Sequence, residues 1–495
     1  MGRDEPGDRG SRVNRRDLLK GLGVAGTSGA IGYAIGDLTG DTRDGDPSSP
    51  RDPSEPTVDD QPTQGPVTDT EEPGQQAVRH ADAYPNVIDA VDAGADPNGT
   101  IPINALLEKA TSDGTLVSFP KGTYRIDPLR LEDLHNVAIA GATEERPTFV
   151  ATRDVCLDLA YLRFQNVSDF LFDGIDLDFT RRGAGGEFRV VADGDVTVQN
   201  VEITGNCNRQ IAGFRMDVTD PNGVGLVKNL RAHHRATTKL TGFFVGESHA
   251  GEVTFEDCDV SGFSDNGLYA SAMGLPDGGD GAVHAVGGSY VNNNISGVRL
   301  GSTGSTARNV DVVVDTVPSG DDVNARGIRL RNRRDILVEN CSVTFGPDAG
   351  ESFGALVVHG DNGGAHVRDS TLNVDADMVP AIHAFEPNKD ETDPLVFENL
   401  AVTGSAAGSY AATITGRDET SFENCTFEQS GKNRGGIRLA DSAGCRIVDS
   451  HIEATRNPVV ASDGDVLVQN TTIVTPAGTR HVKNAVVENS VLNPK

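Results

Sequence analysis

Short segments in which apolar and polar residues alternate recur along most of this chain. Residues 327–330 (GIRL) and 336–340 (ILVEN) both alternate, and the second segment ends at an asparagine. A third segment, 341–345 (CSVTF), follows that asparagine with almost no loop. Because successive residues of a strand point to opposite faces, each segment predicts a short β-strand with one buried face.

The polar residue at the tight turn between the second and third strands recurs. It is found at intervals of 19 to 31 residues, at Asp173, Asn200, Asn229, Asp257, Gly288, Asp311, Asn340, Asp369, Asn399, Asn424, Asp449, Asn470 and Asn489. Asn and Asp suit such turns because they tolerate the left-handed conformation and bond neighbouring backbone groups. This period predicts a solenoid whose coils bury their apolar faces on one another. The Leu-x-x-Leu-x-Leu frame of leucine-rich repeats, the rival interpretation, is absent.

The start of the repeats has its own pattern. Residues 103–110 predict one short amphipathic helix, and residues 115–126 predict a strand, a Pro-x-Gly turn and a second strand. The segment 94–99 (GADPNG), this helix and the segment 119–124 (FPKGTY) together resemble the entry to the right-handed parallel β-helix proteins of the pectate lyase superfamily. The resemblance covers roughly residues 85 to 495. It implies an all-β, right-handed parallel β-helix of about thirteen coils, with three short strands per coil.

The first 84 residues predict a targeting segment and a linker. Residues 14–20 (NRRDLLK) resemble the twin-arginine export motif, and the uncharged run that follows is short and glycine-rich for a membrane span. We expect a signal segment at 1–36, a disordered acidic linker at 37–84 and the β-helix at 85–495, with an N-terminal cap at 85–135. The expected location is extracellular or at the cell surface, with the first segment either cleaved or retained as an anchor.

Charge narrows the choice of partners. Lys and Arg number 43 against 73 Asp and Glu, which gives a net charge of −30, and only 9 of the cations are Lys. This balance resembles that of proteins from extreme halophiles, although an ordinary acidic secreted protein is the alternative. A polyanion of this kind disfavours nucleic acid as a partner.

The cysteines do not form an evident disulfide framework. Cys258, Cys341 and Cys425 share one inward position and lie three coils apart, about 14 Å, beyond disulfide reach. We expect these three and Cys445 to be free and buried. The pairing of the remaining two, Cys156 and Cys207, is left open.

Candidate chemistry lies on the outward positions of the Gly-x-x strand, because the first sheet of the resembled superfamily usually carries the substrate groove. The alignment places these positions at Arg215, Phe244, Tyr269, Arg299, Arg329, Val357, His383, Thr413 and Arg438, with Asp217, Gly246, Ser271, Gly301, Arg331, His359 and Phe385 two residues further on. Neighbouring coils would set such side chains about 4.8 Å apart. Arginine forks pair with carboxylates and sulfates, and aromatic rings stack on sugar faces. The expected substrate-binding residues are therefore Arg215, Phe244, Arg299, Arg329, Arg331 and His359, and the expected partner is an acidic polysaccharide or cell-surface glycan.

Catalysis is a further hypothesis. A lyase or epimerase acting on uronic sugars needs its carboxylate neutralised and a base near the C5 proton, for which Tyr269 and His383 are candidates. A glycosidase needs two carboxylates, and Asp265 is one candidate. The sequence lacks the Asp-Asp plus Gly-His-Gly, Arg-x-Pro-x-x-Arg and Asp-Pro-His signatures of the resembled enzymes. No cofactor is expected: no Cys or His pair has metal-ligand spacing, and for Ca²⁺, which stays open, no specific site is readable.

Three classes of function follow. The first is a lyase, hydrolase or epimerase, the second a non-catalytic glycan binder, and the third a structural or adhesion protein. In the third, the outward arginines would be paired with the protein's own carboxylates, such as Asp265, Asp321 and Asp322.

Overall fold

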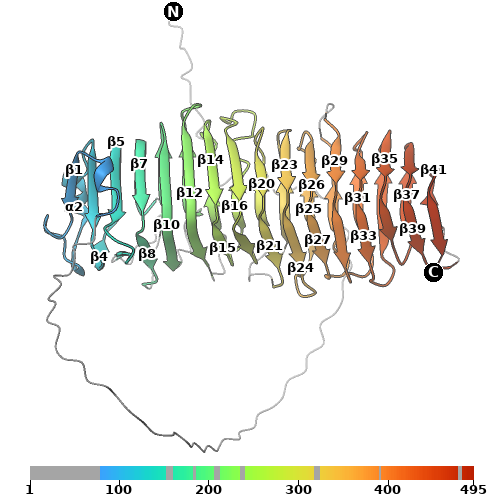
Figure 1. Cartoon of the computed structure of the whole chain (residues 1–495), viewed down its shortest axis with the longest axis horizontal. Coiled ribbons are helices and arrows are strands. Elements are labelled where there is room, and N and C mark those ends of the chain that lie inside the picture. The colour runs from blue at the N-terminus through green and yellow to red at the C-terminus, as the bar shows by residue number, and fades with distance from the viewer. Residues whose placement is uncertain are drawn as a thin grey trace, which may run out of the picture. The chain divides into compact units, whose positions relative to one another are not determined.

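The computed structural model describes residues 78–151, 160–181, 186–205, 212–234, 240–316, 324–388, 392–477 and 482–494. The expected signal segment and most of the expected linker lie outside these residues. The described part is a single elongated stack of strands that run across its long axis (Figure 1). It is an all-β parallel solenoid of about 12 turns with 3% helix, which confirms the predicted fold class.

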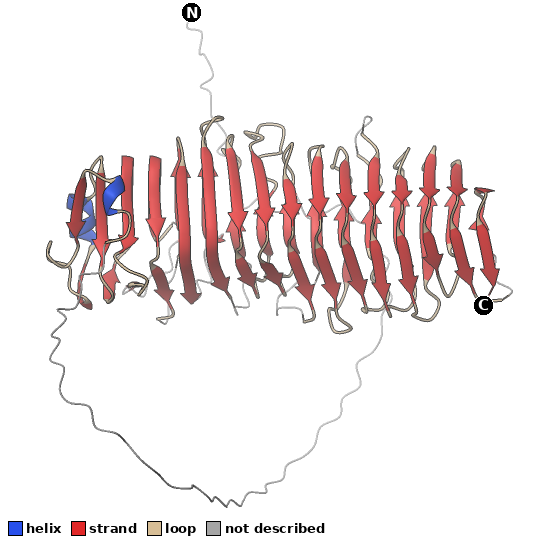
Figure 2. Ribbon diagram, in the orientation of Figure 1, coloured by secondary structure: helices blue, strands red, loops and turns tan. Residues whose placement is uncertain are grey.

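Three parallel sheets run the length of the solenoid (Figure 2). The first sheet carries the predicted outward row. Its strands, in order along the axis, are β5 (Leu129–Gly141), β7 (Leu162–Asp173), β9 (Phe188–Ala192), β11 (Ala212–Val218), β13 (Thr241–Phe244), β16 (Asn266–Ala270), β19 (Ser296–Leu300), β22 (Ala325–Leu330), β25 (Ser352–Val358), β28 (Ile382–Ala384), β31 (Tyr410–Thr415), β34 (Gly435–Ala440), β37 (Val459–Ser462) and β40 (Val482–Lys483).

The other two sheets complete each turn, and several long strands bend from one sheet into the next. The second sheet continues from β1 (Asn86–Asp89) and β3 (Thr115–Phe119), through parts of β5, β7, β10 (Val196–Gly205) and β12 (Val224–His233), to β14 (Glu252–Glu256), β17 (Ala282–Val286), β20 (Thr306–Arg308), β23 (Ile336–Glu339), β26 (Ala365–Arg368), β29 (Leu395–Glu398), β32 (Ser421–Glu423), β35 (Cys445–Val448), β38 (Val466–Gln469) and β41 (Val486–Glu488). The third comprises β2 (Asn98–Pro102), β4 (Thr123–Ile126), β6 (Thr148–Ala151), β8 (Asp176–Phe179), parts of β10 and β12, β15 (Asp259–Ser261), β18 (Ser289–Val291), β21 (Asp311–Val314), β24 (Ser342–Phe345), β27 (Thr371–Val374), β30 (Ala401–Gly404), β33 (Thr426–Gln429), β36 (His451–Glu453), β39 (Thr472–Thr475) and β42 (Val491–Pro494).

Alternation along each strand builds the core. Val298, Ile328 and Leu356 lie in register on β19, β22 and β25 and are fully buried. Each such side chain contributes roughly 1.5–3 kcal/mol relative to an exposed one. The inward face of one strand therefore fixes the outward face, because the two alternate residue by residue.

The turn ladder is present with three corrections. Gly174 and Gly287, with φ angles of 66° and 65°, occupy the turn in place of the predicted Asp173 and Gly288, which are each one residue away. Asn340, Asn399 and Asn424 adopt left-handed φ angles of 52°, 54° and 53°. Asn340 donates from Nδ2 to Oδ1 of Asn309 at 2.6 Å, and Asn424 to Oδ1 of Asn399 at 2.8 Å. The prediction of Asp311 as a ladder member was wrong: Asn309 occupies the turn with a φ of 56°, whereas Asp311 begins strand β21. Two turn-forming residues stand two positions apart there, so residue type alone does not identify the turn.

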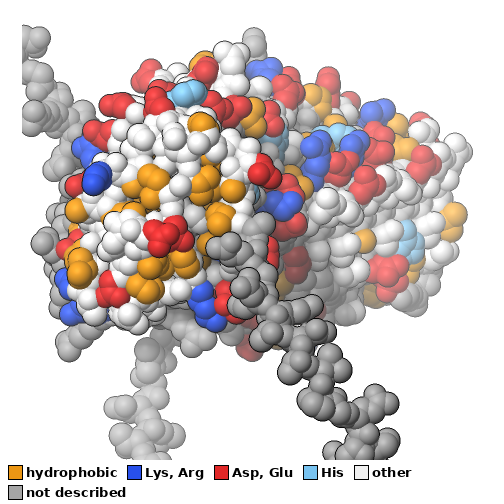
Figure 3. Space-filling model, turned by 60° about the vertical axis from the view of Figure 1, so that its left-hand side comes forward, with side chains coloured by type: hydrophobic (Ala, Val, Ile, Leu, Met, Phe, Trp, Pro, Cys, Tyr) orange, Lys and Arg blue, Asp and Glu red, His pale blue; other side chains and the backbone are white. Residues whose placement is uncertain are grey.

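The N-terminal end is closed by helix α2 (Asn104–Ala110), which lies within the predicted 103–110 and buries Leu107. Hydrophobic side chains gather on this end of the solenoid (Figure 3). Residues 78–84, which we assigned to the linker, already contact the solenoid. They include the 3₁₀ helix η1 (Ala81–Ala83), and Arg79 and His80 both reach Oδ2 of the buried Asp173, at 2.7 and 2.6 Å.

The four cysteines of the described part behave as predicted. Cys258, Cys341, Cys425 and Cys445 are free and buried. Burial raises the pKa of the Cys258 thiol to about 12 and that of Cys341 to about 11. Cys156 and Cys207 lie outside the described residues. No helix in the described ranges has the length and hydrophobicity that a membrane span requires.

Candidate anion-binding face

The outward side chains of the first sheet form one continuous row, here called the arginine row. Strand register places its members in the predicted order, Arg215, Phe244, Tyr269, Arg299, Arg329, Val357, His383, Thr413 and Arg438. The same register extends the row toward the N-terminus through Arg130, Arg163 and Arg189. Sequence reasoning missed these three because strands β5, β7 and β9 lack the Gly-x-x frame used for the alignment.

In the N-terminal half of the row, arginines pair with partners on their own strands. Arg215 donates from Nε to Oδ2 of Asp217 at 2.8 Å, and its guanidinium lies 5.2 Å from the Phe244 ring centroid. The other three arginines each bond a side chain two residues away in the chain: Arg130 bonds Glu132, Arg163 bonds Gln165 and Arg189 bonds Glu187. This half therefore matches the structural interpretation, although three of the partners lie within strands and the fourth, Glu187, immediately precedes β9.

The middle of the row is different, and we call Arg299, Arg326, Arg329 and Arg331 the arginine cluster. All four side chains lie on the outer side of the sheet but are covered, with 5–7% of their surface exposed. We expected the side chains of Arg299, Arg329 and Arg331 to point outward and to be exposed. They do point outward, but the expectation of exposure was wrong. Covered guanidinium groups are costly unless each one is paired.

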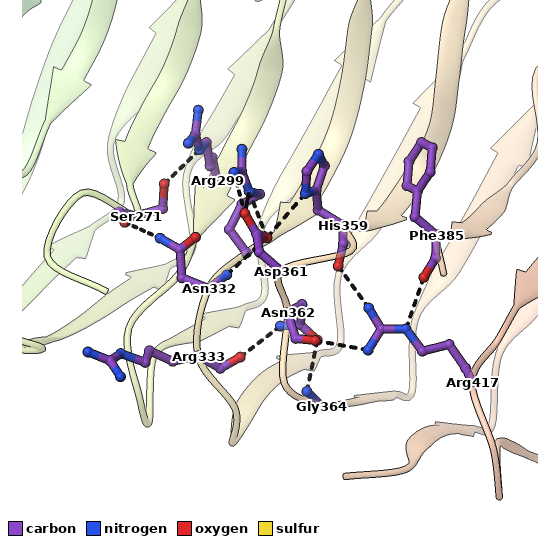
Figure 4. Close-up of polar contacts among 11 residues, drawn as sticks. Ser271, Arg299, Asn332, Arg333, His359, Asp361, Asn362, Gly364, Phe385 and Arg417 are labelled. Carbon is purple, nitrogen blue, oxygen red and sulfur yellow. Dashed lines mark hydrogen bonds and ion pairs between the residues drawn. The ribbon is translucent and has the colours of Figure 1, made fainter. Parts of the chain in front are cut away.

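Two members of the cluster have strong partners. Arg331 forms a two-point ion pair with Asp361, whose Oδ1 also accepts from the backbone N–H of Asn332 at 3.2 Å (Figure 4). Arg299 donates from Nε to Ser271 Oγ at 2.7 Å, and its guanidinium carbon lies 4.0 Å from the Tyr269 ring centroid. Burial opposes the ionisation of Asp361, but the nearby His359 ring and the two-point contact with Arg331 outweigh it, so its pKa lies well below the usual range.

Arg326 was missed by the sequence because strict alternation with Arg329 would direct it inward. At Gly327 the strand lies so close to its neighbours that a Cβ would overlap the Ala355 carbonyl and the Val343 side chain. The register with β25 also shifts between residues 325 and 326. Arg326 consequently faces outward, with Nη1 donating to the carbonyls of Ile295 and Asn324, each at 3.2 Å.

Arg329 has no hydrogen bond or ion pair with any residue that the structure describes, and its Nε is buried without a partner. Burial, together with the charges of Arg299, Arg326 and Arg331, lowers the pKa of Arg329 to about 7. A guanidinium keeps its proton in proteins, so the shift expresses how unfavourable this charge is in the free protein. Asp321 and Asp322, considered above as partners, lie outside the described residues.

Four rings lie beside the cluster and form what we call the ring platform: Phe353, His359, His383 and Phe385. His383 stacks on Phe385 with 4.2 Å between centroids, and Phe353 lies 5.5 Å from Phe385. The guanidinium carbon of Arg326 lies 4.7 Å from the Phe353 ring centroid, which joins the platform to the cluster. Burial lowers the pKa of both His359 and His383, so both are predominantly neutral near pH 7.

The predicted catalytic residues do not meet in one place. Tyr269 and His383 lie four strands apart on the first sheet, roughly 19 Å at the usual spacing. Asp265 immediately precedes β16, and its Oδ1 accepts from Nδ2 of Asn266 at 2.7 Å. A different acid–base pair is present: Nδ1 of His359 lies 3.2 Å from Oδ1 of Asp361 (Figure 4). Sequence reasoning missed Asp361 because it follows the strand in a loop.

A buried arginine, Arg417, binds the backbone near Asp361 and the ring platform. Arg417 donates to the carbonyls of His359 at 2.8 Å, Asn362 at 2.9 Å and Phe385 at 3.0 Å (Figure 4). Its three acceptors belong to the segments that follow β25 and β28. The backbone of two platform residues, His359 and Phe385, is therefore held by one side chain from a later turn of the solenoid.

No metal site accompanies these groups: within the described ranges, no three or more His, Cys, Asp or Glu residues are placed to hold an ion. A cavity of about 670 Å³ lies at the C-terminal end, lined by residues such as Val466, Val486 and Leu492. None of its lining residues belongs to the arginine cluster or the ring platform.

No protein-family model matches this chain. No curated protein matches it either. Among solved structures, it is similar to the catalytic unit of a GH87 α-1,3-glucanase from Streptomyces thermodiastaticus, with 14% identity over 82% of this chain and 68% of that one, at a TM-score of 0.41. The A-module of the mannuronan C-5 epimerase AlgE4 from Azotobacter vinelandii gives 14% identity, 82% and 96% coverage and a TM-score of 0.35. The Streptococcus pneumoniae surface protein and adhesin PfbA gives 13% identity over 82% of this chain and 100% of that one, with a TM-score of 0.42. At these values the likeness carries neither an activity nor a ligand over to this chain.

Proposed function

We propose that this protein binds an anionic polysaccharide through the arginine cluster and the ring platform. The observation that carries the proposal is Arg329, a covered guanidinium without a partner among the described residues. An anionic group of the ligand would supply the missing counter-charge through a charge-assisted hydrogen bond. The adjacent rings offer flat apolar faces on which sugar rings stack. The protein would meet this ligand outside the cell or at the cell surface, after export by the twin-arginine segment.

The proposal confines strong binding to the middle of the arginine row. Arg215, one of the expected binding residues, already has a buried carboxylate partner in Asp217. A ligand would have to displace that partner to use this guanidinium. Arg329 has no such partner among the described residues.

The test compares two arginines of the same row in binding assays against a panel of anionic polysaccharides, at fixed ionic strength. Arg329→Ala should weaken binding by about 1.5–3 kcal/mol, the value of a charged hydrogen bond. Arg329→Lys should restore only part of the loss because lysine lacks the planar fork. Arg438→Ala is the matched control, since Arg438 is an exposed arginine four strands further along. Binding by the Arg329→Ala variant that equals the parent would refute the proposal.

A catalytic role is the second candidate, and the pair His359–Asp361 favours it. Asp361 is fixed by Arg331 and Asn332, so it can hold the imidazole with Nδ1 protonated and leave Nε2 as a base. Arg329 would neutralise a uronate carboxylate and so acidify its C5 proton. This assignment replaces Tyr269 and His383 in the role of base, and it does not use Asp265, the glycosidase candidate.

Lyase activity would appear as unsaturated product absorbance from a uronate polymer. His359→Gln should abolish it because the base is removed, and Asp361→Asn should reduce it because the imidazole loses the carboxylate beside it. Product formation that survives His359→Gln would exclude this base. Binding without any product would leave the protein a non-catalytic binder.

A further inference from the structure

We propose that the anionic group recognised by the arginine cluster is a phosphoryl group, carried by the glycan as a phosphate monoester. This inference rests on the proposed function, because it names the chemistry of the ligand at the same site. The inference distinguishes phosphorylated glycans from two other classes, uronic acid polymers and sulfated glycans. The carboxylate or sulfate ester of those two classes carries one negative charge per group.

The first argument is the charge of the cluster. Four guanidinium groups are covered there, and two carboxylates act on them among the described residues: Asp361, which pairs with Arg331, and Asp265, which lies close enough to favour the charge of Arg299. Counted over the described residues, two positive charges remain uncompensated. A phosphate monoester carries about two negative charges at neutral pH, whereas a carboxylate or a sulfate ester carries one.

The second argument is the number of free donors. Arg329 uses none of its N–H groups with described residues, Arg299 uses Nε alone, and Arg326 uses Nη1 alone. These three guanidinium groups come from the adjacent strands β19 and β22. A carboxylate has two oxygens to share among these donors, whereas a phosphoryl group has three terminal oxygens that accept bonds from several arginines at once.

The third argument is the neighbouring ring platform. The Arg326 guanidinium faces the cluster on one side and lies over the Phe353 ring on the other. A phosphoryl group between Arg299 and Arg329 would therefore place its sugar within reach of Phe353 and Phe385. Among the described cation–aromatic contacts, the pair of Arg456 over Tyr410, at 4.5 Å, lies on later turns and offers a control for the stacking contribution.

The experiment measures binding of the full chain to a hexose 6-phosphate, inorganic phosphate, sulfate, glucuronate and glucose, by calorimetry at pH 8 and constant ionic strength. The hexose phosphate should bind at least about tenfold more tightly than glucuronate or sulfate. The preference should shrink at pH 5, because the second phosphate ionisation has a pKa near 6.

Variants then locate the site. Arg329→Ala and Arg299→Ala should each reduce phosphate-ester affinity by about tenfold or more, and Arg438→Ala should leave it unchanged. Phe353→Ala should weaken the hexose phosphate but not inorganic phosphate, whereas Tyr410→Ala should affect neither. Arg329→Lys, which keeps the charge, provides a second variant should Arg329→Ala fail to fold.

Three outcomes overturn the inference in different ways. Glucuronate or its polymers binding as tightly as the phosphate ester, with the same loss in Arg329→Ala, would exclude a phosphoryl preference but support the anionic polysaccharide site. Phosphate binding that survives both arginine changes would mean an adventitious ion only. No anion whose binding depends on Arg329 would refute this inference and the proposed function together.

Discussion

Arg417 offers a demanding test of how the site is held. Its side chain is 1% exposed, and it donates to three backbone carbonyls in the segments that follow β25 and β28. Replacing it with methionine keeps the volume roughly constant and removes all three bonds. The Asn362 carbonyl would be left buried without a donor, at a cost of about 1–3 kcal/mol. The other two carbonyls are partly exposed and can rehydrate, which adds about 1 kcal/mol in total.

The gain from removing the guanidinium offsets part of this cost, because burial already lowers its pKa to about 10. We therefore expect a local loss of about 2–3 kcal/mol. Global unfolding is a poor probe in a solenoid, where each turn contacts only its neighbours. Native-state hydrogen exchange is better suited, because it reports local opening.

The amides to follow are those of Asn362, Gly363 and Asn388, which donate to His359, Arg333 and Gly360. Their exchange should accelerate by about 30- to 150-fold in Arg417→Met, since 1.4 kcal/mol corresponds to a factor of ten. Arg434→Met is the matched control. Arg434 is equally buried and also donates to two carbonyls, those of Gly408 and Val379, so it should accelerate amides near those residues instead. Unchanged rates at the three amides, or equal acceleration on all turns, would refute the reasoning.

Three further predictions concern stability. Asn340→Ala should lower local stability by about 2 kcal/mol, because alanine disfavours the left-handed turn and the bond to Asn309 is lost. Asn340→Gly should cost only about 1 kcal/mol, because glycine loses the bond but accepts the turn. Equal hydrogen-exchange rates near this turn in the two variants would contradict the ladder. Burial lowers the pKa of His234 to about 4, so between pH 6.5 and 4 the unfolded chain binds a proton that the folded protein does not, and stability falls as the pH falls. His234→Phe should retain the stacking on Phe263 and reduce this slope by up to about 1.4 kcal/mol per pH unit in denaturation curves; an unchanged slope would exclude His234 as the source. Thermal midpoints should rise as potassium chloride increases to molar levels, because salt screens the net charge of −30; a flat or falling midpoint would contradict the halophile interpretation.

The sequence allowed the fold and the order of the arginine row to be predicted because both depend on local periodicity. Gly267, Gly297 and Gly327 are spaced thirty residues apart, and the strand that follows each one alternates in the same phase. That phase placed Tyr269, Arg299 and Arg329 correctly on neighbouring strands.

The properties of individual side chains depend on contacts that periodicity does not encode. Alternation directed Arg329 outward, but it did not reveal that the side chain is covered, with 7% of its surface exposed. Asp361 lies in a loop, and Arg326 faces outward where the register of β22 with β25 shifts. The charge balance of the cluster, on which the proposed chemistry depends, therefore could not be read from the sequence.

The strict register of the first sheet has a consequence for how such a protein can change over time. From Tyr269 to Arg299 and from Arg299 to Arg329, one complete turn takes thirty residues. Each such turn contributes one rung to the row. Duplication or loss of one unit within the gene would lengthen or shorten the row while leaving the remaining rungs in phase. Insertion of a single residue within a strand would instead exchange inner and outer faces. The length of the ligand segment that this face accommodates is thus open to change by whole-turn steps, independently of the chemistry at any one rung.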